Sequence, residues 1–343
     1  MTDPGKRGEL SLEERLAAEE AEGQTEDHDD HGPGVAAPGG ASGAQIAGAV
    51  GEAPTTQASL WGDAWRQLRK SPLFIIPVIF LSIFTVMAVA PGLFTSKSPR
   101  ACDLSNIIVD GQQLIRGPGS GHPFGFDPQG CDYYTRVIYG TRVSLSIGLL
   151  TVFFASLIAV TLGSISGFYG RWIDGLVTRF ADIIFAIPLI LGGIILLNSL
   201  GNRSLMTVSL ALVVLIWPTT MRLMRSSVLS IKEMDYVQAA RAMGASDVRI
   251  MRKHILPNGL APVIVYATIT VGITIATEAT LSFLGVGLQL PAISWGLMIS
   301  GAQGRIELYP HLLFFPAAFL VVMVFSFILL GDALRDALDP RSR

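Results

Sequence analysis

Six nearly charge-free apolar windows dominate this 343-residue chain. Each has about 18 residues or more, the length that a helix needs to cross a bilayer core of about 30 Å. Half of the residues are hydrophobic and 15% are charged, which is too apolar for an ordinary soluble domain. We therefore predict an all-α polytopic membrane protein. Its six transmembrane helices are expected at residues 73–94, 143–167, 180–200, 204–222, 259–283 and 310–331.

The charges of the chain are segregated. Residues 1–60 carry twelve acids against three bases, whereas the rest of the chain carries 22 bases against 15 acids. Because the bases are spread over loops rather than gathered in one patch, nucleic acid is not expected as a partner. The acidic run continues into Gly-, Ala- and Pro-rich sequence. We therefore predict a disordered cytoplasmic tail over residues 1–70.

Lysine and arginine also indicate an orientation. With the N-terminus inside, fifteen bases of the membrane body face the cytoplasm and seven face outward, in agreement with the positive-inside rule. Six spans then return the C-terminus to the cytoplasm. We expect the first transmembrane helix at 71–95 and an extracytoplasmic loop at 96–140. The core follows at 141–343, with five transmembrane helices and a cytoplasmic loop at 226–257.

The only two cysteines, Cys102 and Cys131, fall in the predicted extracytoplasmic loop. Disulfides persist outside the plasma membrane, and two cysteines in one such loop form a natural pair. Two unpaired thiols are the alternative that remains open.

Small residues and prolines indicate how the spans pack. Gly163 and Gly167 have the small-xxx-small spacing that lets two helices approach closely, and we expect ordinary helix packing there. Pro188 and Pro218 lie inside predicted spans. Neighbouring helices can satisfy the carbonyl groups that a proline leaves unbonded, so bends are expected at these positions.

A short, soluble-looking segment separates the fourth and fifth predicted spans. Residues 236–243 suit a helix, and Gly244 permits the left-handed backbone that ends one. Ser246 and Asp247 are suited to cap a second helix, which we expect Pro257 to stop.

The resulting helix–glycine–helix structure is slim because of Ala239, Ala240, Ala242 and Ala245, so it suits the groove of another protein. A generic amphipathic loop on the membrane surface is the alternative.

The residues Ala239 to Asn258, AARAMGASDVRIMRKHILPN, resemble the cytoplasmic loop of bacterial ABC importer permeases. The family pattern is Glu-Ala-Ala, three residues, Gly, nine residues and Ile-x-Leu-Pro. Here Gln238 replaces the glutamate, so the resemblance supports docking but no role for a charge at that position. In the family, the first short helix docks into a cleft of the ATP-binding subunit and transmits its closure. The docking residues that the resemblance implies are Tyr236, Gln238, Ala239, Ala240, Arg241, Gly244, Ala245, Ser246, Asp247, His254, Leu256 and Pro257.

Three further stretches resemble the C-type permeases for dipeptides and oligopeptides. They are HPFGFDPQGCDYYTRVIYGTRVSLSIG, EATLSFLGVGLQLPAISWGLMIS and LGDALRDALDPR. The family usually has Gly-Arg-Asp where this chain has Gly130-Cys131-Asp132, which favours a role such as the disulfide for Cys131. The resemblance covers about residues 70–343 and implies the type I ABC importer permease fold.

The resemblance implies a transport subunit of the bacterial inner membrane that forms half of a pathway for di- or oligopeptides. Its expected partners are a second homologous permease in a heterodimer, two ATP-binding domains, an extracytoplasmic solute-binding protein and membrane lipid. No catalytic residue, metal or cofactor is expected in this chain. ATP and magnesium belong to the partner ATPase subunits, and the chain lacks a G-x-x-x-x-G-K-[ST] loop. Nickel chelates, haem or glutathione are alternative substrates.

An ion-coupled secondary transporter is the alternative class of protein. Such transporters often show inverted repeats and buried ionisable residues in mid-membrane. This chain shows no convincing repeat, and its main candidate charge is Glu278, at the outer end of the fifth span. We expect Glu278 to cap a re-entrant or interfacial loop, with a gating or proton-carrying role as the alternative. A membrane enzyme is disfavoured because neither H-E-x-x-H nor G-x-S-x-G occurs.

Overall fold

The computed structural model describes residues 62, 65–66, 68–109 and 112–338. The chain divides into two units, Met1–Thr56 and Gln57–Arg343, and every described residue belongs to the second. Most of the predicted disordered tail therefore lies outside the described residues.

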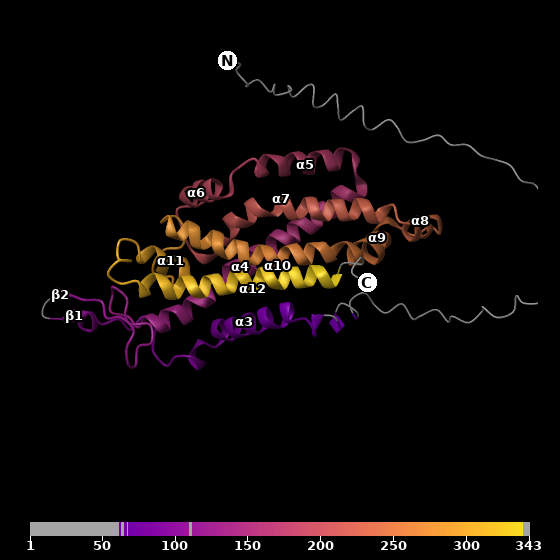
Figure 1. Ribbon diagram of the computed structural model, residues 1–343. Coiled ribbons are helices and arrows are strands. Elements are labelled where there is room, and N and C mark those ends of the chain that lie inside the picture. Colours follow the sequence, from indigo (N-terminus) through magenta and orange to yellow (C-terminus); the bar gives the residue numbers. More distant parts are fainter. Residues whose placement is uncertain (1–61, 63–64, 67, 110–111, 339–343) are drawn as a thin grey trace, which may run out of the picture. The chain divides into compact units, whose positions relative to one another are not determined.

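In the described part of the chain, five helices are long and apolar enough to cross a membrane. They are α3 (Pro72–Val89), α4 (Tyr133–Tyr169), α7 (Leu205–Lys232), α10 (Leu256–Phe283) and α12 (His311–Leu338) (Figure 1). α5 (Arg171–Phe185) and α6 (Leu189–Leu200) meet the same criteria only as a pair, and they are bent by 87° at their junction. If this pair is one span, the number of spans is the predicted six.

The remaining described elements are short. Two 3₁₀ turns, η1 (Pro91–Leu93) and η2 (Leu104–Asn106), and two antiparallel strands, β1 (Ile108–Val109) and β2 (Gln112–Gln113), lie between α3 and α4. Between α7 and α10 lie α8 (Asp235–Ala242), α9 (Asp247–Ile250) and the π-helical turn η3 (Met251–Ile255). α11 (Trp295–Gly301) precedes α12.

The predicted span over 180–200 is two helices, broken at Pro188, where a bend was expected. α5 ends at Phe185, and α6 begins directly after Pro188. The proline ring fixes its own φ and removes an N–H, and it disfavours helical backbone at the preceding residue, Ile187. The chain therefore turns sharply at this point.

The predicted loop 96–140 extends too far, because α4 already begins at Tyr133. Asp132 caps this helix, and its carboxylate accepts a hydrogen bond from the Thr135 N–H at 3.1 Å. The charged residue Arg136 remains in the helix because it pairs with Asp127. Because the predicted span was a charge-free apolar window, it excluded Arg136 and therefore the first turns of α4.

The predicted loop 226–257 starts too early for a similar reason. α7 continues to Lys232, past Arg225, which forms two hydrogen bonds of 2.6 and 2.5 Å with the Asp174 carboxylate of α5. The pair keeps the charge of Arg225 compensated within the helix, as is usual for ionisable residues in membrane helices.

Pro257 does not stop the second helix of the segment, contrary to our expectation. The helix runs without interruption from Asp247 to Phe283. In the π-helical turn, the Leu256 N–H donates to the Met251 carbonyl, five residues back. Pro257 follows directly after this turn, whose wider bonding pattern accommodates a residue without an N–H.

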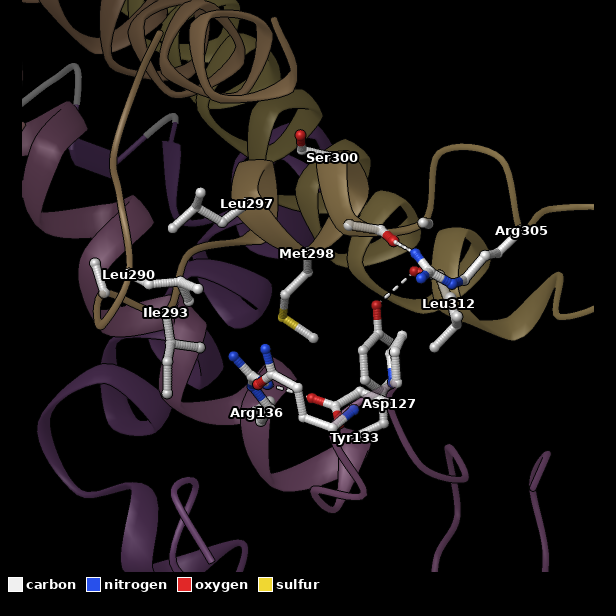
Figure 2. A pocket seen from close by; sticks show the side chains of 15 residues that line it. Asp127, Tyr133, Arg136, Leu290, Ile293, Leu297, Met298, Ser300, Arg305 and Leu312 are labelled. Carbon is white, nitrogen blue, oxygen red and sulfur yellow. Dashed lines mark hydrogen bonds and ion pairs between the residues drawn. The ribbon is translucent and has the colours of Figure 1, made fainter. Parts of the chain in front are cut away.

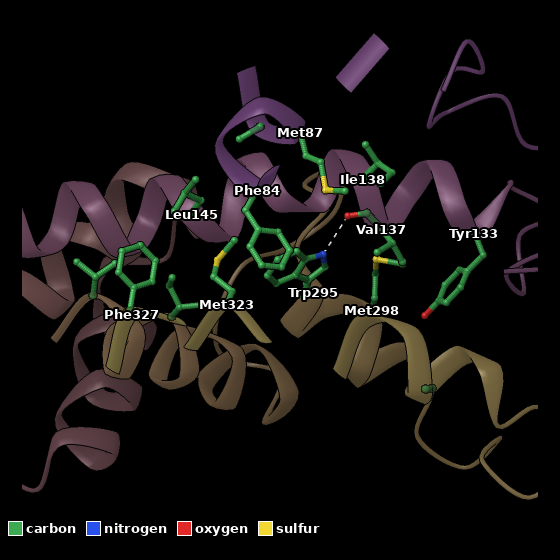
Figure 3. Packing of buried hydrophobic residues seen from close by; sticks show 14 of the residues in the cluster. Phe84, Met87, Tyr133, Val137, Ile138, Leu145, Trp295, Met298, Met323 and Phe327 are labelled. Atoms are coloured by element: carbon green, nitrogen blue, oxygen red, sulfur yellow. Dashed lines mark hydrogen bonds between the residues drawn. The ribbon is translucent and has the colours of Figure 1, made fainter. Parts of the chain in front are cut away.

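Trp295 anchors the short helix α11 in the hydrophobic core (Figure 3). Its side chain is fully buried, and its indole N–H donates to the Val137 carbonyl of α4 at 3.0 Å. The rings of Phe84 from α3 and Phe319 from α12 lie edge-on to it, with centroids 5.8 and 6.0 Å away. One side chain therefore joins α11 to three long helices.

α4 and α7 approach each other closely at Gly163 and Gly167. A Cβ atom on Gly163 would stand 2.6 Å from the Met221 carbonyl oxygen, and one on Gly167 would stand 2.9 Å from the Val228 Cβ. Both distances are shorter than a normal contact, so the two backbones meet only because these positions lack side chains. The packing predicted from the small-xxx-small spacing is confirmed.

The segment between α3 and α4 is held by covalent and polar contacts. Cys102 and Cys131 form a disulfide, with their Cα atoms 4.0 Å apart. Asp132 lies 2.7 Å from His122 Nδ1 and accepts hydrogen bonds from Thr135. Burial favours a higher pKa of Asp132, but these hydrogen bonds and nearby Lys97 outweigh it, so its pKa lies below the usual value.

We expect Gly163→Ala to destabilise the protein by about 1–3 kcal/mol, because the added methyl group forces α4 and α7 apart. The matched control is Gly175→Ala on α5, where an added Cβ would meet nothing within 4 Å. Thermal unfolding of the purified, detergent-solubilised protein measures both effects. Equal unfolding temperatures for the two variants would contradict the close-approach explanation.

We expect neither cysteine to react with a maleimide in unreduced, denatured protein, and both to react after reduction. The two cysteines are 29 residues apart, and closing a loop of this length lowers the entropy of the unfolded chain by an amount worth about 3–4 kcal/mol. Cys102→Ser with Cys131→Ser is therefore expected to make the loop more sensitive to protease. Alkylation of both thiols without reductant, measured by mass spectrometry, would refute the disulfide.

Candidate functional site

The α8–α9 segment (Asp235–Ile250) is the main candidate site. It leaves the end of α7 and lies at the opposite end of the helices from β1 and β2 (Figure 1). α8 has Asp235 in its first turn and Arg241 in its last, so both charges interact favourably with the helix dipole. The Gln238 side chain donates to the Lys232 carbonyl at 3.0 Å and ties α8 to α7.

Gly244 ends α8 in the left-handed conformation, as predicted, with a φ of 82°. The Ala245 N–H donates to the Ala240 carbonyl, and the Gly244 N–H donates to the Arg241 carbonyl, both at 3.0 Å. These two bonds form a Schellman motif, which uses carbonyl groups that would otherwise lack partners at the helix end. The turn between α8 and α9 is thus fixed by backbone geometry.

The predicted cap of α9 is only partly correct. Ser246 occupies the N-cap position with extended backbone, but its side chain makes no capping hydrogen bond. Asp247 lies in the first turn, where its negative charge favours the helix dipole.

The segment is anchored from beneath by apolar contacts. Val237 of α8 and Ile250 of α9 are fully buried. They belong to one hydrophobic cluster with residues of α4, α7, η3 and α10, namely Phe168, Met224, Val228, Ile255 and Val263. The guanidinium of Arg241 also lies 5.9 Å from the centre of the Phe168 ring. The segment is therefore seated on three long helices.

The opposite face of the segment is exposed and partly apolar. Tyr236 and Met243 are 44% and 82% exposed, and the small residues Ala239 and Ala242 are exposed beside them. Val248 of α9 is 62% exposed and lines a cavity beside α4. An exposed apolar surface on a rigid base is characteristic of a protein contact. Met243 and Val248 were not among the residues that the family pattern indicated; their high exposure identifies them only in the structure.

The end of the sequence motif, His254 to Asn258, lies beside the start of α8. The rings of Tyr236 and His254 lie 6.0 Å apart, and Asn258 donates to the His254 carbonyl at 2.7 Å. Leu256 packs against the hydrophobic cluster beneath the segment, whereas Pro257 is exposed on α10. The structure therefore brings the beginning and the end of the motif together.

Glu278 lies apart from this segment, in α10. Its side chain is fully buried, and one carboxylate oxygen accepts hydrogen bonds from Ser282 at 2.7 Å and Ser294 at 3.3 Å. Ser294 is the N-cap of α11. Glu278 thus joins the end of α10 to the beginning of α11.

A second candidate site is a cavity of about 500 Å³ beside α11 and the first turns of α4 and α12 (Figure 2). Its polar groups include Arg136, which pairs with Asp127, and Tyr133, whose hydroxyl donates to the Leu312 carbonyl at 2.5 Å. Its apolar wall contains Leu290, Ile293, Leu297, Met298 and Leu312. No sequence motif indicates this cavity, because its walls come from segments that are far apart in the chain.

Two ion pairs between α5 and α7 were also missed. Besides the pair of Asp174 with Arg225, Asp182 pairs with Arg222 at 2.7 Å. The signal was present in the sequence, since acids and bases placed within apolar segments of a membrane protein usually have partners. In the described part of the chain, no group of three or more His, Cys, Asp or Glu side chains is placed to hold a metal.

Comparison with known proteins agrees with this architecture. Residues 159–343 match the family model "Binding-protein-dependent transport system inner membrane component", and residues 59–109 match "N-terminal TM domain of oligopeptide transport permease C". A solved structure of the MetNI methionine ABC transporter in an inward-facing conformation is similar in fold. Its TM-score is 0.50 and its identity 23%, over 60% of this chain and 96% of that chain.

Two curated relatives are similar over most of their length. The dipeptide transport system permease protein DppC of Alkalihalophilus pseudofirmus is 40% identical, over 84% of this chain and 92% of the relative. The glutathione transport system permease protein GsiD of Pectobacterium atrosepticum is 34% identical, over 82% of this chain and 91% of the relative.

Permeases of this family are non-catalytic and carry no cofactor, and their partner ATPases bind ATP. The matches cover both the first span and the core of the chain. The chain therefore belongs to the family of binding-protein-dependent inner-membrane permeases, as a multi-pass subunit of an ABC importer of the peptide and glutathione type.

Proposed function

We propose that this subunit forms one half of the translocation pathway of an importer for di- or oligopeptides, and that the α8–α9 segment is its docking surface for the ATP-binding partner. The geometry of that segment is the observation that carries the proposal. Val237 and Ile250 hold it against the long helices, while Tyr236 and Met243 leave its outer face available to another protein.

Rigid attachment is what makes the segment suited to transmit movement. α8 follows α7 after only two intervening residues, and α9 continues through η3 into α10 without interruption. A displacement of the segment therefore moves the adjoining ends of two membrane-spanning helices. A flexible loop would absorb such a displacement instead.

Docking does not require a charge at Gln238. Its side-chain amide is engaged with the Lys232 carbonyl, so it shapes the segment from within the chain. The partner ATPase would instead contact the apolar side chains of Tyr236 and Met243, with Ala239 and Ala242 allowing close approach. Arg249, on the flank, is exposed and adds positive charge.

In this proposal the α8–α9 segment and both termini face the cytoplasm. The disulfide-bonded segment and the 500 Å³ cavity then face outward, where the solute-binding protein delivers its cargo. A second, homologous permease supplies the other half of the pathway, and two ATP-binding domains lie beneath the heterodimer. The excess of lysine and arginine on the α8–α9 side supports this orientation.

Glu278 has a structural role in this proposal. The hydrogen bonds from Ser282 and Ser294 make it the link between α10 and α11 rather than a carrier of ions. Peptides are the proposed cargo because the relative named for dipeptide transport is 40% identical, against 34% for the relative named for glutathione.

We expect the transporter, reconstituted with its second permease, ATPases and binding protein, to take up labelled dipeptide only when ATP is present. Collapse of the proton gradient should leave this uptake unchanged, because Glu278 is not a proton carrier. Reduced glutathione, nickel chelates and haem are the competing cargoes to test. Preferential uptake of one of these would correct the substrate, and uptake driven by an ion gradient without ATP would overturn the importer mechanism.

We expect Gly244→Val to abolish peptide uptake and substrate-stimulated ATPase activity while leaving membrane insertion normal. Gly244 has a φ of 82°, which a β-branched residue resists, so the variant should distort the turn between α8 and α9. An added Cβ meets nothing within 4 Å inside the chain, so the core beneath should remain intact.

Arg249→Ala is the matched control in the same segment, because Arg249 is exposed and forms no ion pair among the described residues. Its uptake should remain close to that of the unmodified protein. Both variants are quantified in the membrane by immunoblot before uptake and ATP hydrolysis are compared. Full, coupled transport by Gly244→Val would show that the segment is only a surface connector.

A further inference from the structure

Two cavities that share Val160 lie along α4, the larger facing α10 and α12 and the smaller facing α9, η3 and the start of α10. The larger, about 530 Å³, lies beside Leu149–Val160 of α4 and Leu260–Val271 of α10. The smaller, about 270 Å³, lies beside Val160–Tyr169 of α4 and the stretch from Val248 to Leu256. Val160 lines both. We call the two adjoining cavities together the α4–α10 groove.

The groove is long enough for a lipid chain. From Leu149 to Ser164 it follows α4 over about 22 Å, at a rise of about 1.5 Å per residue. Half of a bilayer's hydrocarbon core is about 15 Å thick. The groove is therefore at least as long as one leaflet of the hydrocarbon core is thick.

The walls of the groove suit an acyl chain better than a protein helix. Leu149, Phe153 and Leu157 are 47%, 63% and 57% exposed, and the facing residues of α10 include Leu260, Val263 and Ile264. Helices that pack against each other in membranes meet through small residues, as α4 and α7 do. Ser156, Ala267 and Thr268 also line the larger cavity, and the large apolar side chains around this open depression provide contacts for a flexible hydrocarbon chain.

The end of the groove beside α9 is basic. Arg252 lines it, and Arg249 and Lys253 are exposed nearby in sequence. Within the described residues, none of these three bases forms an ion pair or a side-chain hydrogen bond. Such basic pockets at the ends of membrane helices attract anionic lipid headgroups.

Two exposed aromatic side chains support the placement of this end at the membrane surface. Tyr169 and Trp172, where α4 meets α5, are 47% and 74% exposed, and aromatic side chains of this kind gather at membrane–water interfaces.

We propose that the α4–α10 groove is a binding site for one anionic phospholipid, with an acyl chain along α4 and α10 and the phosphate at Arg252. The bound lipid would fill the space beside the α8–α9 segment and steady its flank. The inference rests on the membrane-spanning assignment of α4 and α10 and is independent of the transported substrate.

The test uses the complete transporter, purified in a mild detergent and supplied with phosphatidylglycerol or phosphatidylcholine of identical chains. Native mass spectrometry measures the lipid retained. We expect phosphatidylglycerol to be retained more strongly than phosphatidylcholine. Its affinity should fall about fivefold in Arg252→Gln, and about fivefold further in the double variant Arg252→Gln with Lys253→Gln. The control is Arg100→Gln, an equal loss of charge in the segment between α3 and α4, which should change nothing.

A second variant tests the groove itself. Val160→Trp keeps every charge but fills the point that both cavities share, so it should lower the retention of both lipids. Three results would overturn the proposal. They are equal retention of the two lipids, unchanged phosphatidylglycerol affinity in the double variant, and absence of any retained lipid because a partner helix fills the groove. Lipid retention is measured without transport. The lipid-site proposal and the proposed import of peptides can therefore be refuted independently.

Discussion

The close approach of α4 and α7 at Gly163 and Gly167 is the contact on which the rest of the core depends. Lipid supplies no hydrophobic force between two apolar helices, so their association relies on backbone packing at small residues. From this contact α7 continues directly toward α8, and α4 presents Phe168 to the cluster beneath α8 and α9. The position of the α8–α9 segment therefore follows from two glycines within the membrane.

The same environment limits where the helices can break. A backbone group in hydrocarbon requires a partner within the protein, so irregular backbone is tolerated only where the fold protects it. At Pro188 the chain breaks beside α7, to which α5 is fastened by Asp174–Arg225 and Asp182–Arg222. At Pro257 the chain does not break, because the preceding π-helical turn accommodates a residue that has no N–H to donate.

Long helices connect two ends of very different character. At one end, the disulfide, the Asp127–Arg136 pair and buried Trp295 hold short segments against the helices. At the other end, the α8–α9 segment presents exposed apolar side chains on a seated base, and the α4–α10 groove ends beside it. Because α7 and α10 adjoin the segment at both of its ends, a force on it reaches the core without passing through a flexible linker.

The sequence by itself determined the membrane character, the position of the five long apolar helices, the packing at Gly163 and the left-handed turn at Gly244. Each depends on local composition or on the conformational freedom of one residue, so each can be predicted from residues that are close together in the sequence. It did not determine where α4 begins or α7 ends, how sharply the chain turns between α5 and α6, or the continuation of the helix through Pro257. The burial of Trp295, whose bonding partner lies 158 residues away, and the α4–α10 groove were equally hidden. These features depend on residues that are far apart in the sequence, which neutralise charges, accept hydrogen bonds from buried groups and line cavities. Only the tertiary structure decides which of these residues come into contact.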